Sequence, residues 1–451
     1  MSDLRRALGT LEYFTFGFGS MVGVGWLVVM DDWLGRGGPG GAVLGFLAGG
    51  LLLLPIARTY GRLVQRIPDA GAEVAYAERV FPRGVSFAAG WVMVLAYAIV
   101  CPWEAVAIGN LLARVVPGLD AVPLYVVAGR TIYAPRLAAG LVLTALIALV
   151  NWRGIRASGV VQDVTTLSLL AAFAVFSVLG FARGDVATAR PLFAAPGTGG
   201  ALLSTLLVLQ IVPYFMTGFE SVAKASEEAR PELDRRRFAL AIDLAVIAGA
   251  LFYAIVIAAV ALVFPWRELV AGHLGSDIAF ARAFGSRGVA RLMLCAALLS
   301  LFKVFNGNFV AATRLVFALG RRGLVPRVLG AVHPRHGTPG AAVLLVASLT
   351  AAAACLGDAV LVPISEVGSL AGAVGWLAAC AAYVAGRRGE GAGAVRVAVA
   401  GAVVSAAIIL MKVVPGVPGS FTGPEWVAFA GWCGLGVVLW LGRGKERISP
   451  A

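Results

Sequence analysis

Twelve long apolar segments constrain this chain more than any other feature of its sequence. Most are close to the twenty or so residues that an α-helix needs to cross the hydrocarbon core of a bilayer. The chain is 60% hydrophobic and only 14% charged, whereas a soluble domain is nearer half apolar. We therefore predict an all-α polytopic membrane protein with transmembrane helices at 11–34, 40–61, 85–116, 135–151, 157–181, 201–223, 238–264, 289–318, 340–356, 363–386, 394–414 and 425–442.

The distribution of charge along the chain indicates how these spans are oriented. The net charge is +13, and most Lys and Arg residues, Lys224 among them, fall in loops on the side that holds both termini. This bias places that side in the cytoplasm. The sequence therefore predicts a multi-pass protein of a bacterial-type inner or plasma membrane, with cytoplasmic tails at 1–10 and 443–451. The excess positive charge then reflects topology and predicts no binding of nucleic acid.

Glycine and proline interrupt the first and the sixth apolar segments. Glycines crowd the stretch 19–25 of the first segment, and Pro213 opens an interruption of the sixth at 213–220. Glycine costs about 1 kcal/mol in a helix interior relative to alanine, and proline removes a backbone donor. Unwound backbone at membrane depth survives only where protein buries it or it lines a cavity. Breaks in the first and sixth segments are what an inverted five-plus-five repeat would produce, and they point to a transporter's binding site.

Three motifs in this order resemble those of the amino acid–polyamine–organocation transporter superfamily: the first break, the sequence Gly218-Phe219-Glu220-Ser221 continuing to Glu227-Glu228, and the loop 320–326. The resemblance covers nearly the whole chain. It implies a LeuT-like fold with broken helices 1 and 6. The first inverted repeat would be helices 1 to 5 at 11–181, the second helices 6 to 10 at 201–386, and two peripheral helices would follow at 394–442.

The ends of the broken helices predict how a zwitterion would bind. Free amides at an N-terminal half-helix end favour an anion, and free carbonyls at a C-terminal end favour a cation. We expect the amides of 22–25 to receive a carboxylate and the carbonyls of 214–217 to hold an amino group. The predicted substrate-binding residues are Ser20, Met21, Val22, Gly23, Val24, Gly25, Trp103, Glu104, Tyr214, Phe215, Met216, Thr217 and Gly218.

Two aromatic residues flank the second break and could close over a substrate. Phe215 and Phe219 are therefore predicted to be gates, although aromatic residues in a span more often serve packing alone. Glu104 lies inside the third segment, where a carboxylate is expensive and indicates function by default. The alternative is a protonated structural carboxyl that bonds to a neighbouring helix.

The candidates for proton coupling are Lys303, Glu220 and Glu104. Many relatives carry a lysine near the position of Ser168, where it takes the place of a sodium ion, and this chain has none there. Lys303 in the eighth segment could supply that ammonium, because helices 1, 5 and 8 meet at the cation site of the shared fold. The alternative is a permanent ion pair of Lys303 with Asp163 or Glu104. Glu220 resembles an acidic position of the family that links proton movement or opening to binding.

The sequence carries no enzymatic motif. There is no nucleophile elbow, no phosphate-binding loop, and no Cys or His cluster with the spacing of metal ligands. We therefore expect no enzyme activity, no cofactor and no metal site. The five cysteines fall inside predicted spans, so we predict no disulfide framework either.

The function that this sequence predicts is import of an amino acid or related amine by alternating access, with proton-coupled symport. The alternatives are an exchanger without ion coupling, a non-transporting substrate sensor with the same fold, and, last, a channel. If Glu104 is ionised and faces the site, a cationic amine becomes the better substrate. The expected partners are the small-molecule substrate, protons and membrane lipid, and the protein would be a monomer or homodimer. The sequence leaves open the substrate, the coupling ion, the direction of flux and the oligomeric state.

Overall fold

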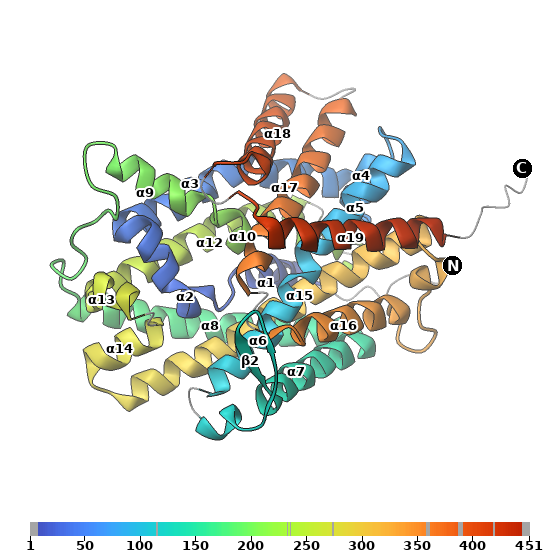
Figure 1. Ribbon diagram of the computed structural model, residues 1–451. Helices are drawn as coiled ribbons and strands as arrows, with labels where there is room; N and C mark the ends of the chain where they lie inside the picture. The colour runs from blue at the N-terminus through green and yellow to red at the C-terminus, as the bar shows by residue number, and fades with distance from the viewer. Residues whose placement is uncertain are drawn as a thin grey trace, which may run out of the picture.

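Helices make up most of the computed structural model, which describes residues 8–113, 116–231, 233–234, 236–272, 275–357, 361–386, 391–417 and 420–443 (Figure 1). Within these residues, 10 helices are long and apolar enough to cross a membrane. The predicted sixth and ninth spans contain shorter apolar helices, α9 (Gly200–Leu209) and α16 (Gly340–Ala354). The outer parts of both predicted tails, at 1–7 and 444–451, lie outside the described residues.

The remaining elements follow the predicted segments in order, with short helices between them. They are α1 (Thr10–Met21), α2 (Gly25–Val28), α3 (Met30–Arg66), α4 (Glu73–Ala77), α5 (Arg83–Ala98), α6 (Val100–Ala113), α7 (Ala134–Arg153), α8 (Ile155–Arg183), α10 (Val212–Met216), α11 (Ser221–Lys224), α12 (Arg236–Val263), α13 (Trp266–Ala271), α14 (Ser276–Phe284), α15 (Arg287–Arg321), α17 (Leu361–Ala385), α18 (Ala392–Val413) and α19 (Gly423–Leu441). Three 3₁₀ turns complete the set, η1 (Pro117–Asp120), η2 (Ser226–Glu228) and η3 (Arg327–Gly330).

The first span is broken as expected, but over a shorter stretch. Helix α1 continues to Met21 and α2 begins at Gly25, so only 22–24 are unwound. Ser20 therefore stays helical, although the glycine-rich sequence from residue 19 predicted earlier unwinding. Gly19 serves packing instead, because a Cβ there would collide with the side chains of Gln162 and Thr166 on α8.

The second break lies after Pro213 and not at it. Pro213 sits in the first turn of α10, where a helix has no use for the missing N–H. The chain unwinds over 217–220, between α10 and α11. Gly218 has a φ of +128°, a conformation that side chains other than glycine rarely adopt. The position of the break is thus set by this glycine.

The first and second spans are joined by a corner of one residue. The predicted spans leave 35–39 between them, whereas α3 runs from Met30 to Arg66 with only Gly38 in a non-helical conformation, at φ +62° and ψ 175°. A side chain on Gly38 would meet the backbone of Leu192 and Ala194 at 2.8 Å. The loop that contains Leu192 and Ala194 packs directly on this corner and leaves room only for glycine.

A β-hairpin between α6 and α7 is a departure from the predicted all-helical chain. Strands β1 (Pro123–Val127) and β2 (Arg130–Tyr133) pair antiparallel. Their turn places Ala128 and Gly129 at positive φ, as tight hairpin turns require. Tyr125 donates a hydrogen bond of 2.6 Å to the carbonyl of Cys355, which ties the hairpin to the end of α16. The search for apolar spans missed this short element.

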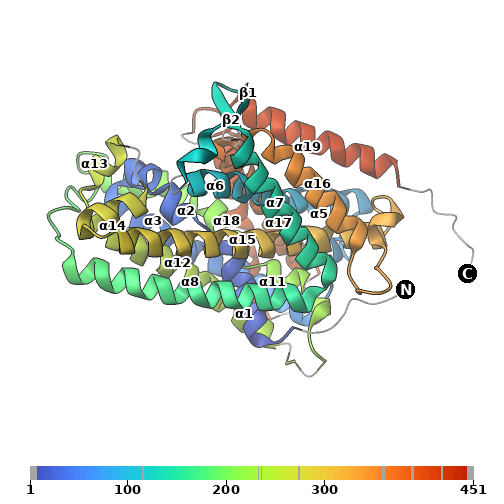
Figure 2. The ribbon, with the colours of Figure 1, turned by 90° about the horizontal axis from the view of Figure 1, so that it is seen from below.

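Helices α8 and α15 lie side by side in both ribbon views (Figures 1 and 2), whereas α17 and α18 run steeply across them in Figure 1. In its most apolar stretch, the first span (α1 with α2) has 78% of its residues buried within the protein, as has the pair α5–α6, whereas α18 and α19 have 22% and 11%. Helix α19 lies along the edge of the bundle in Figure 2. The broken first span is thus central, and the last two helices have faces left for lipid.

Candidate functional site

The second break touches the last turn of α1, directly before the first break. A Cβ built on Gly218 would lie 2.8 Å from the carbonyl carbon of Ser20 and 2.9 Å from the amide nitrogen of Met21. Ser221, at the start of α11, donates a hydrogen bond of 3.3 Å to the carbonyl of Phe16. The tertiary structure therefore brings the predicted residues of segments one and six into one place.

Lys303 on α15 points at the carbonyl end of α1. Its ammonium donates to the carbonyl oxygen of Gly19 at 3.2 Å and to that of Val22. Two neighbours on α15 add to this contact, because Ser300 donates to Val22 at 3.4 Å and Asn308 donates to Ser20 at 2.9 Å. The last carbonyls of a helix carry partial negative charge. The side-chain nitrogen of Lys303 thus lies at a helix end that favours a cation.

Neither of the predicted alternative partners forms an ion pair with Lys303 in the part of the chain that the structure describes. The carboxylate of Asp163 accepts a hydrogen bond of 2.5 Å from the hydroxyl of Thr15. Among the described residues, Lys303 is not within 4.0 Å of a carboxylate oxygen of either Asp163 or Glu104. The bonds of Lys303 therefore go to backbone carbonyls and not into the permanent ion pair that the sequence left open.

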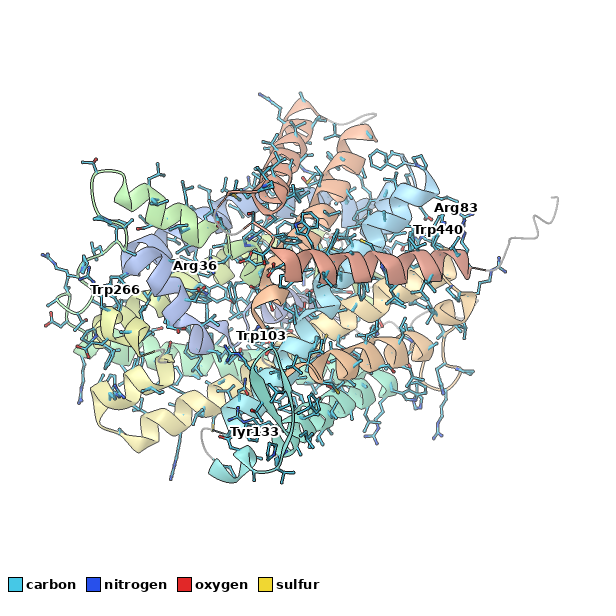
Figure 3. The ribbon with its side chains drawn as sticks, viewed as in Figure 1. Arg36, Arg83, Trp103, Tyr133, Trp266 and Trp440 are labelled. Atoms are coloured by element: carbon cyan, nitrogen blue, oxygen red, sulfur yellow. The ribbon has the colours of Figure 1, made fainter. Side chains whose placement is uncertain are left out.

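Glu104 on α6 faces the first break. Its side chain is only 2% exposed, and its Oε1 atom lies 3.3 Å from the position that a Cβ on Gly23 would occupy. Its Oε2 atom is buried without a hydrogen-bond partner among the described residues. Its neighbour Trp103 is near the middle of the molecule in Figure 3, with Trp266 towards one end and Trp440 towards the other. A buried carboxyl with an unused oxygen is thus placed at the break.

The free backbone groups are fewer than the sequence predicts. The amide of Val22 is not available for a carboxylate, because it donates to the carbonyl of Phe18 at 2.9 Å. Among the described residues, the amides of Val24 and Gly25 have no acceptor. Unwinding that spares the last turn of α1 is the reason for this difference.

The carbonyls predicted to hold an amino group are also only partly free. The carbonyl of Tyr214 accepts from the amide of Thr217 at 3.3 Å, and that of Phe215 accepts from the hydroxyl of Tyr253 at 3.3 Å. Within the described part of the chain, the carbonyls of Met216 and Thr217 accept no hydrogen bond. Two of the four predicted carbonyl ligands are therefore already engaged.

The two predicted gate residues lie in separate aromatic groups. Phe215 packs over Gly25, and its ring centroid is 4.8 Å from that of Trp33. Phe219 is fully buried, with its ring centroid 6.2 Å from that of Tyr60 and 5.7 Å from that of Trp376. One ring thus covers the first break beside α3, while the other packs between α3 and α17.

Glu220 directly precedes α11 and belongs to a buried charged cluster. Its Oε2 atom accepts a hydrogen bond of 3.1 Å from the amide of Gly218, and its Oε1 atom has no partner among the described residues. One turn later, the ammonium of Lys224 lies 2.5 Å from Glu73 on α4 and donates to the carbonyl of Glu220 at 3.3 Å. Tyr60 donates a second hydrogen bond to Glu73.

Lys224 is not where its sequence predicts, and its partner Glu73 was not among the predicted site residues. Lys224 was assigned to a cytoplasmic loop, yet both side chains are 0% exposed. Lys303 is therefore not the one lysine enclosed by the described structure. The available signal was the spacing of Lys224 four residues after Glu220, which places both on one face of a helix. Nothing local in the sequence indicated that Glu73 would reach it.

This chain is similar to known proteins over most of its length. The family described as amino acid permease matches residues 13–413. The amino-acid permease RocE of Bacillus subtilis (strain 168) is 24% identical over 406 residues, which cover 86% of this chain and 82% of RocE. The methylthioribose transporter of the same organism is 24% identical over 345 residues, 75% of this chain and 72% of that protein. Cationic amino acid transporter 4 of Mus musculus is 30% identical over 391 residues, 82% of this chain and 58% of that protein.

Proposed function

Because this chain belongs to the amino acid permease family, and is therefore a multi-pass membrane transporter and not an enzyme, we propose that it imports an amino acid or related amine by alternating access, driven by the proton gradient. We infer a bacterial-type inner or plasma membrane as its location, with both termini in the cytoplasm. Twelve spans then arise when α9 and α16 are counted with the 10 longer helices.

The inverted five-plus-five repeat is part of this proposal. The two broken spans are the first and the sixth, which are the corresponding positions of two five-helix repeats. Gly218 in the second break approaches Ser20, in the last turn of α1 before the first break. In transporters built from inverted repeats, substrate and coupling ions bind where discontinuous helices meet. This arrangement supports binding at the two breaks.

The observation that carries the proton coupling is the contact of Lys303 with the carbonyl end of α1. The ammonium bonds to Gly19 and Val22 and so neutralises the partial charge of an unwound helix end. Loss of one proton removes that charge and weakens the attachment of α15 to α1. The protonation state of Lys303 is thereby linked to the packing of the helix that also binds the substrate. Glu220 and Glu104 remain the other candidates for the coupling proton.

Uptake by reconstituted protein tests this proposal. A panel of labelled amino acids and amines is offered to proteoliposomes with an imposed proton gradient, with parent protein and with Lys303→Ala. We expect the parent to accumulate substrate against its concentration gradient. We expect the variant only to exchange internal for external substrate, without accumulation. Lys412→Ala is the matched control, because Lys412 is also a buried lysine but pairs with Glu366 between α17 and α18. Unchanged concentrative uptake by Lys303→Ala would exclude Lys303 and move the proton to Glu220 or Glu104.

An exchanger without ion coupling is the second candidate. It is favoured by the same contact if Lys303 keeps its proton throughout the cycle, because a permanent ammonium would then serve as a fixed replacement for a coupling cation. In that case the parent protein exchanges substrate across the membrane at equal rates with and without a proton gradient. The uptake experiment separates the two candidates directly.

Glu104 favours a substrate that carries a positive charge beyond its zwitterionic head. The relatives do not decide this point, since the names of those matched include both cationic amino acids and methylthioribose. A buried carboxylate oxygen without a partner is costly unless a ligand satisfies it. A second ammonium, or the amine of a polyamine, would supply that partner beside Gly23.

A further inference from the structure

We propose that Lys224 and Glu73 form a latch that closes the cytoplasmic side of the transporter, and that this side opens when the pair separates. The inference rests on the proposed alternating access, because a latch has meaning only where two conformations exchange. The pair joins α4, in the link between the second and third spans, to α11, the short helix that follows the break in the sixth span.

The ammonium of Lys224 is enclosed on several sides. It lies 2.5 Å from Glu73, and both side chains are 0% exposed. The rings of Tyr60 and Tyr97 stand 5.3 and 4.9 Å from the ammonium, a distance at which aromatic faces attract cations. The carbonyl of Glu220 accepts a further hydrogen bond of 3.3 Å from the ammonium. The pair is therefore held by α3, α4, α5 and α11 together.

The latch is attached to both broken helices. Helix α11 carries Lys224 at its end and Ser221 at its start, and Ser221 bonds to the carbonyl of Phe16 in α1. Its hydroxyl also lies 3.4 Å from that of Ser20. Movement of α11 away from α4 would therefore take the adjoining part of α1 with it, directly beside the contact of Gly218 with the last turn of α1.

A second set of ion pairs fastens the link that contains α4. Arg322, at the end of α15, contacts Asp69 at 2.5 Å and Glu78 at 2.7 Å. Glu227 accepts a hydrogen bond of 2.9 Å from the amide of Ala70 and pairs with Arg321. These pairs are partly exposed, and exposed pairs contribute little. Among the ion pairs that fasten this link, the buried Lys224–Glu73 pair is consequently the one whose separation costs most.

Burial makes this pair behave as a switch with two states. Removing one partner of a buried ion pair leaves an uncompensated charge in a medium of low dielectric constant, which is strongly unfavourable. The cost of separating the two charges falls when water enters, because water can hydrate them. Two buried carboxylate oxygens beside the pair could bind such water. Glu73 Oε2 and Glu220 Oε1 have no hydrogen-bond partner among the described residues. The dry pair thus favours the closed state, and a hydrated cluster favours the open one.

Cysteine labelling tests the latch without requiring transport. Ser226 lies two residues after Lys224, is 4% exposed, and has a buried hydroxyl without a partner among the described residues. Ser226→Cys is made in a background in which the five natural cysteines are replaced. A membrane-impermeant maleimide is then applied to the cytoplasmic face of inside-out vesicles. We expect slow labelling with the pair intact, and labelling about tenfold or more faster in Lys224→Met and in Glu73→Gln.

Two further variants keep the test specific. The exchange Glu73→Lys with Lys224→Glu restores an opposite-charge pair, and we expect it to slow the labelling again. Lys412→Met removes one partner of a different buried pair, near the ends of α17 and α18 remote from α4, and we expect it to leave the labelling rate unchanged. Folding of each variant is checked by size-exclusion chromatography.

Two results would overturn the latch. One is parent-like labelling in both single variants when they are folded, and the other is an exchanged pair that labels as fast as the single variants. Because labelling needs neither substrate nor a proton gradient, a failure of the proposed import would appear in the uptake assay and not in this one.

Discussion

The ammonium of Lys303 donates a hydrogen bond of 3.2 Å to the carbonyl of Gly19, across 284 positions of sequence. This contact places a positive charge from α15 at the point where α1 ends and the first break begins. A helix end in a membrane needs partners for its last carbonyls, and here α15 supplies them. The stability of the break and its chemistry therefore depend on the same side chains.

Asn308 provides a first prediction about that helix end. Its amide donates to the carbonyl of Ser20 at 2.9 Å, and Asn308→Ala would leave this buried carbonyl without its donor. An unsatisfied buried acceptor costs about 1–3 kcal/mol, so we expect a lower thermal midpoint in detergent and weaker substrate binding. Ser405→Ala is the control, because Ser405 bonds only within α18, to Gly401. Equal midpoints for the two variants would show that Asn308 does not support the break.

Glu104 provides a prediction about selectivity. If its free oxygen binds a second ammonium, Glu104→Gln weakens binding of diamino substrates while neutral amino acids of equal length are little affected. A hydrogen bond to a charged group contributes about 1.5–3 kcal/mol, which corresponds to a change of about 10- to 100-fold in relative affinity. Competition against a labelled substrate in proteoliposomes measures this ratio. Glu425→Gln, in the capping box of α19, should leave it unchanged, and a ratio that Glu104→Gln also leaves unchanged would assign Glu104 a structural role.

Gly218 provides a prediction about the second break. Alanine there would be strained at φ +128° and would meet the backbone of Ser20 at 2.8 Å. Strain of this kind costs about 1–3 kcal/mol, and backbone atoms cannot move aside as a flexible side chain could. We expect Gly218→Ala to abolish uptake and to lower the thermal midpoint.

The matched control is Gly434→Ala on α19, because no atom lies within 4 Å of the added Cβ. Alanine is the better helix former by about 1 kcal/mol, so this variant should retain uptake and unfold no earlier than the parent. Active Gly218→Ala protein with a parent-like midpoint would contradict the assigned geometry of the break.

Arg314 and Glu228 provide a prediction about the cytoplasmic end of α15. Their side chains form a buried bidentate pair with contacts of 3.1 and 2.9 Å. Burial raises the pKa of the Glu228 carboxyl, and the guanidinium of Arg314 opposes that rise. Arg314→Met should therefore leave a carboxyl that takes up a proton more readily, and the loss of one partner should cost about 3–5 kcal/mol. We expect Glu228→Gln to recover part of this loss in the double variant, and strictly additive losses would argue against the pair.

Local chemistry was enough to predict the breaks but not their limits. The glycines of 19–25 and Pro213 marked both interruptions, because each residue type disfavours helix by itself. The structure keeps Ser20 helical and starts the second break only after Met216. The limits depend on what satisfies each freed backbone group, and those partners come from α8, α12 and α15. No local pattern contains that information.

The buried lysines show the same difference between what the sequence predicts and what the tertiary structure decides. Hydropathy placed Lys303 inside a span, because a long apolar segment surrounds it. It did not identify the carbonyls to which this lysine bonds. For Lys224 the reasoning was wrong, since a basic residue at the end of a span ordinarily reaches water. Here α4 folds back over it and supplies Glu73 as a partner.

The sequence by itself determined that this chain crosses the membrane many times, that two of its helices are broken, and which side chains lie at the breaks. These properties follow from the free energy of transferring each residue into hydrocarbon and from backbone preferences, which are local. Only the tertiary structure decided that Lys303 meets the end of α1, that Glu104 faces Gly23, and that Lys224 is buried against Glu73. Such contacts join residues far apart in the chain, and the packing of whole helices selects them.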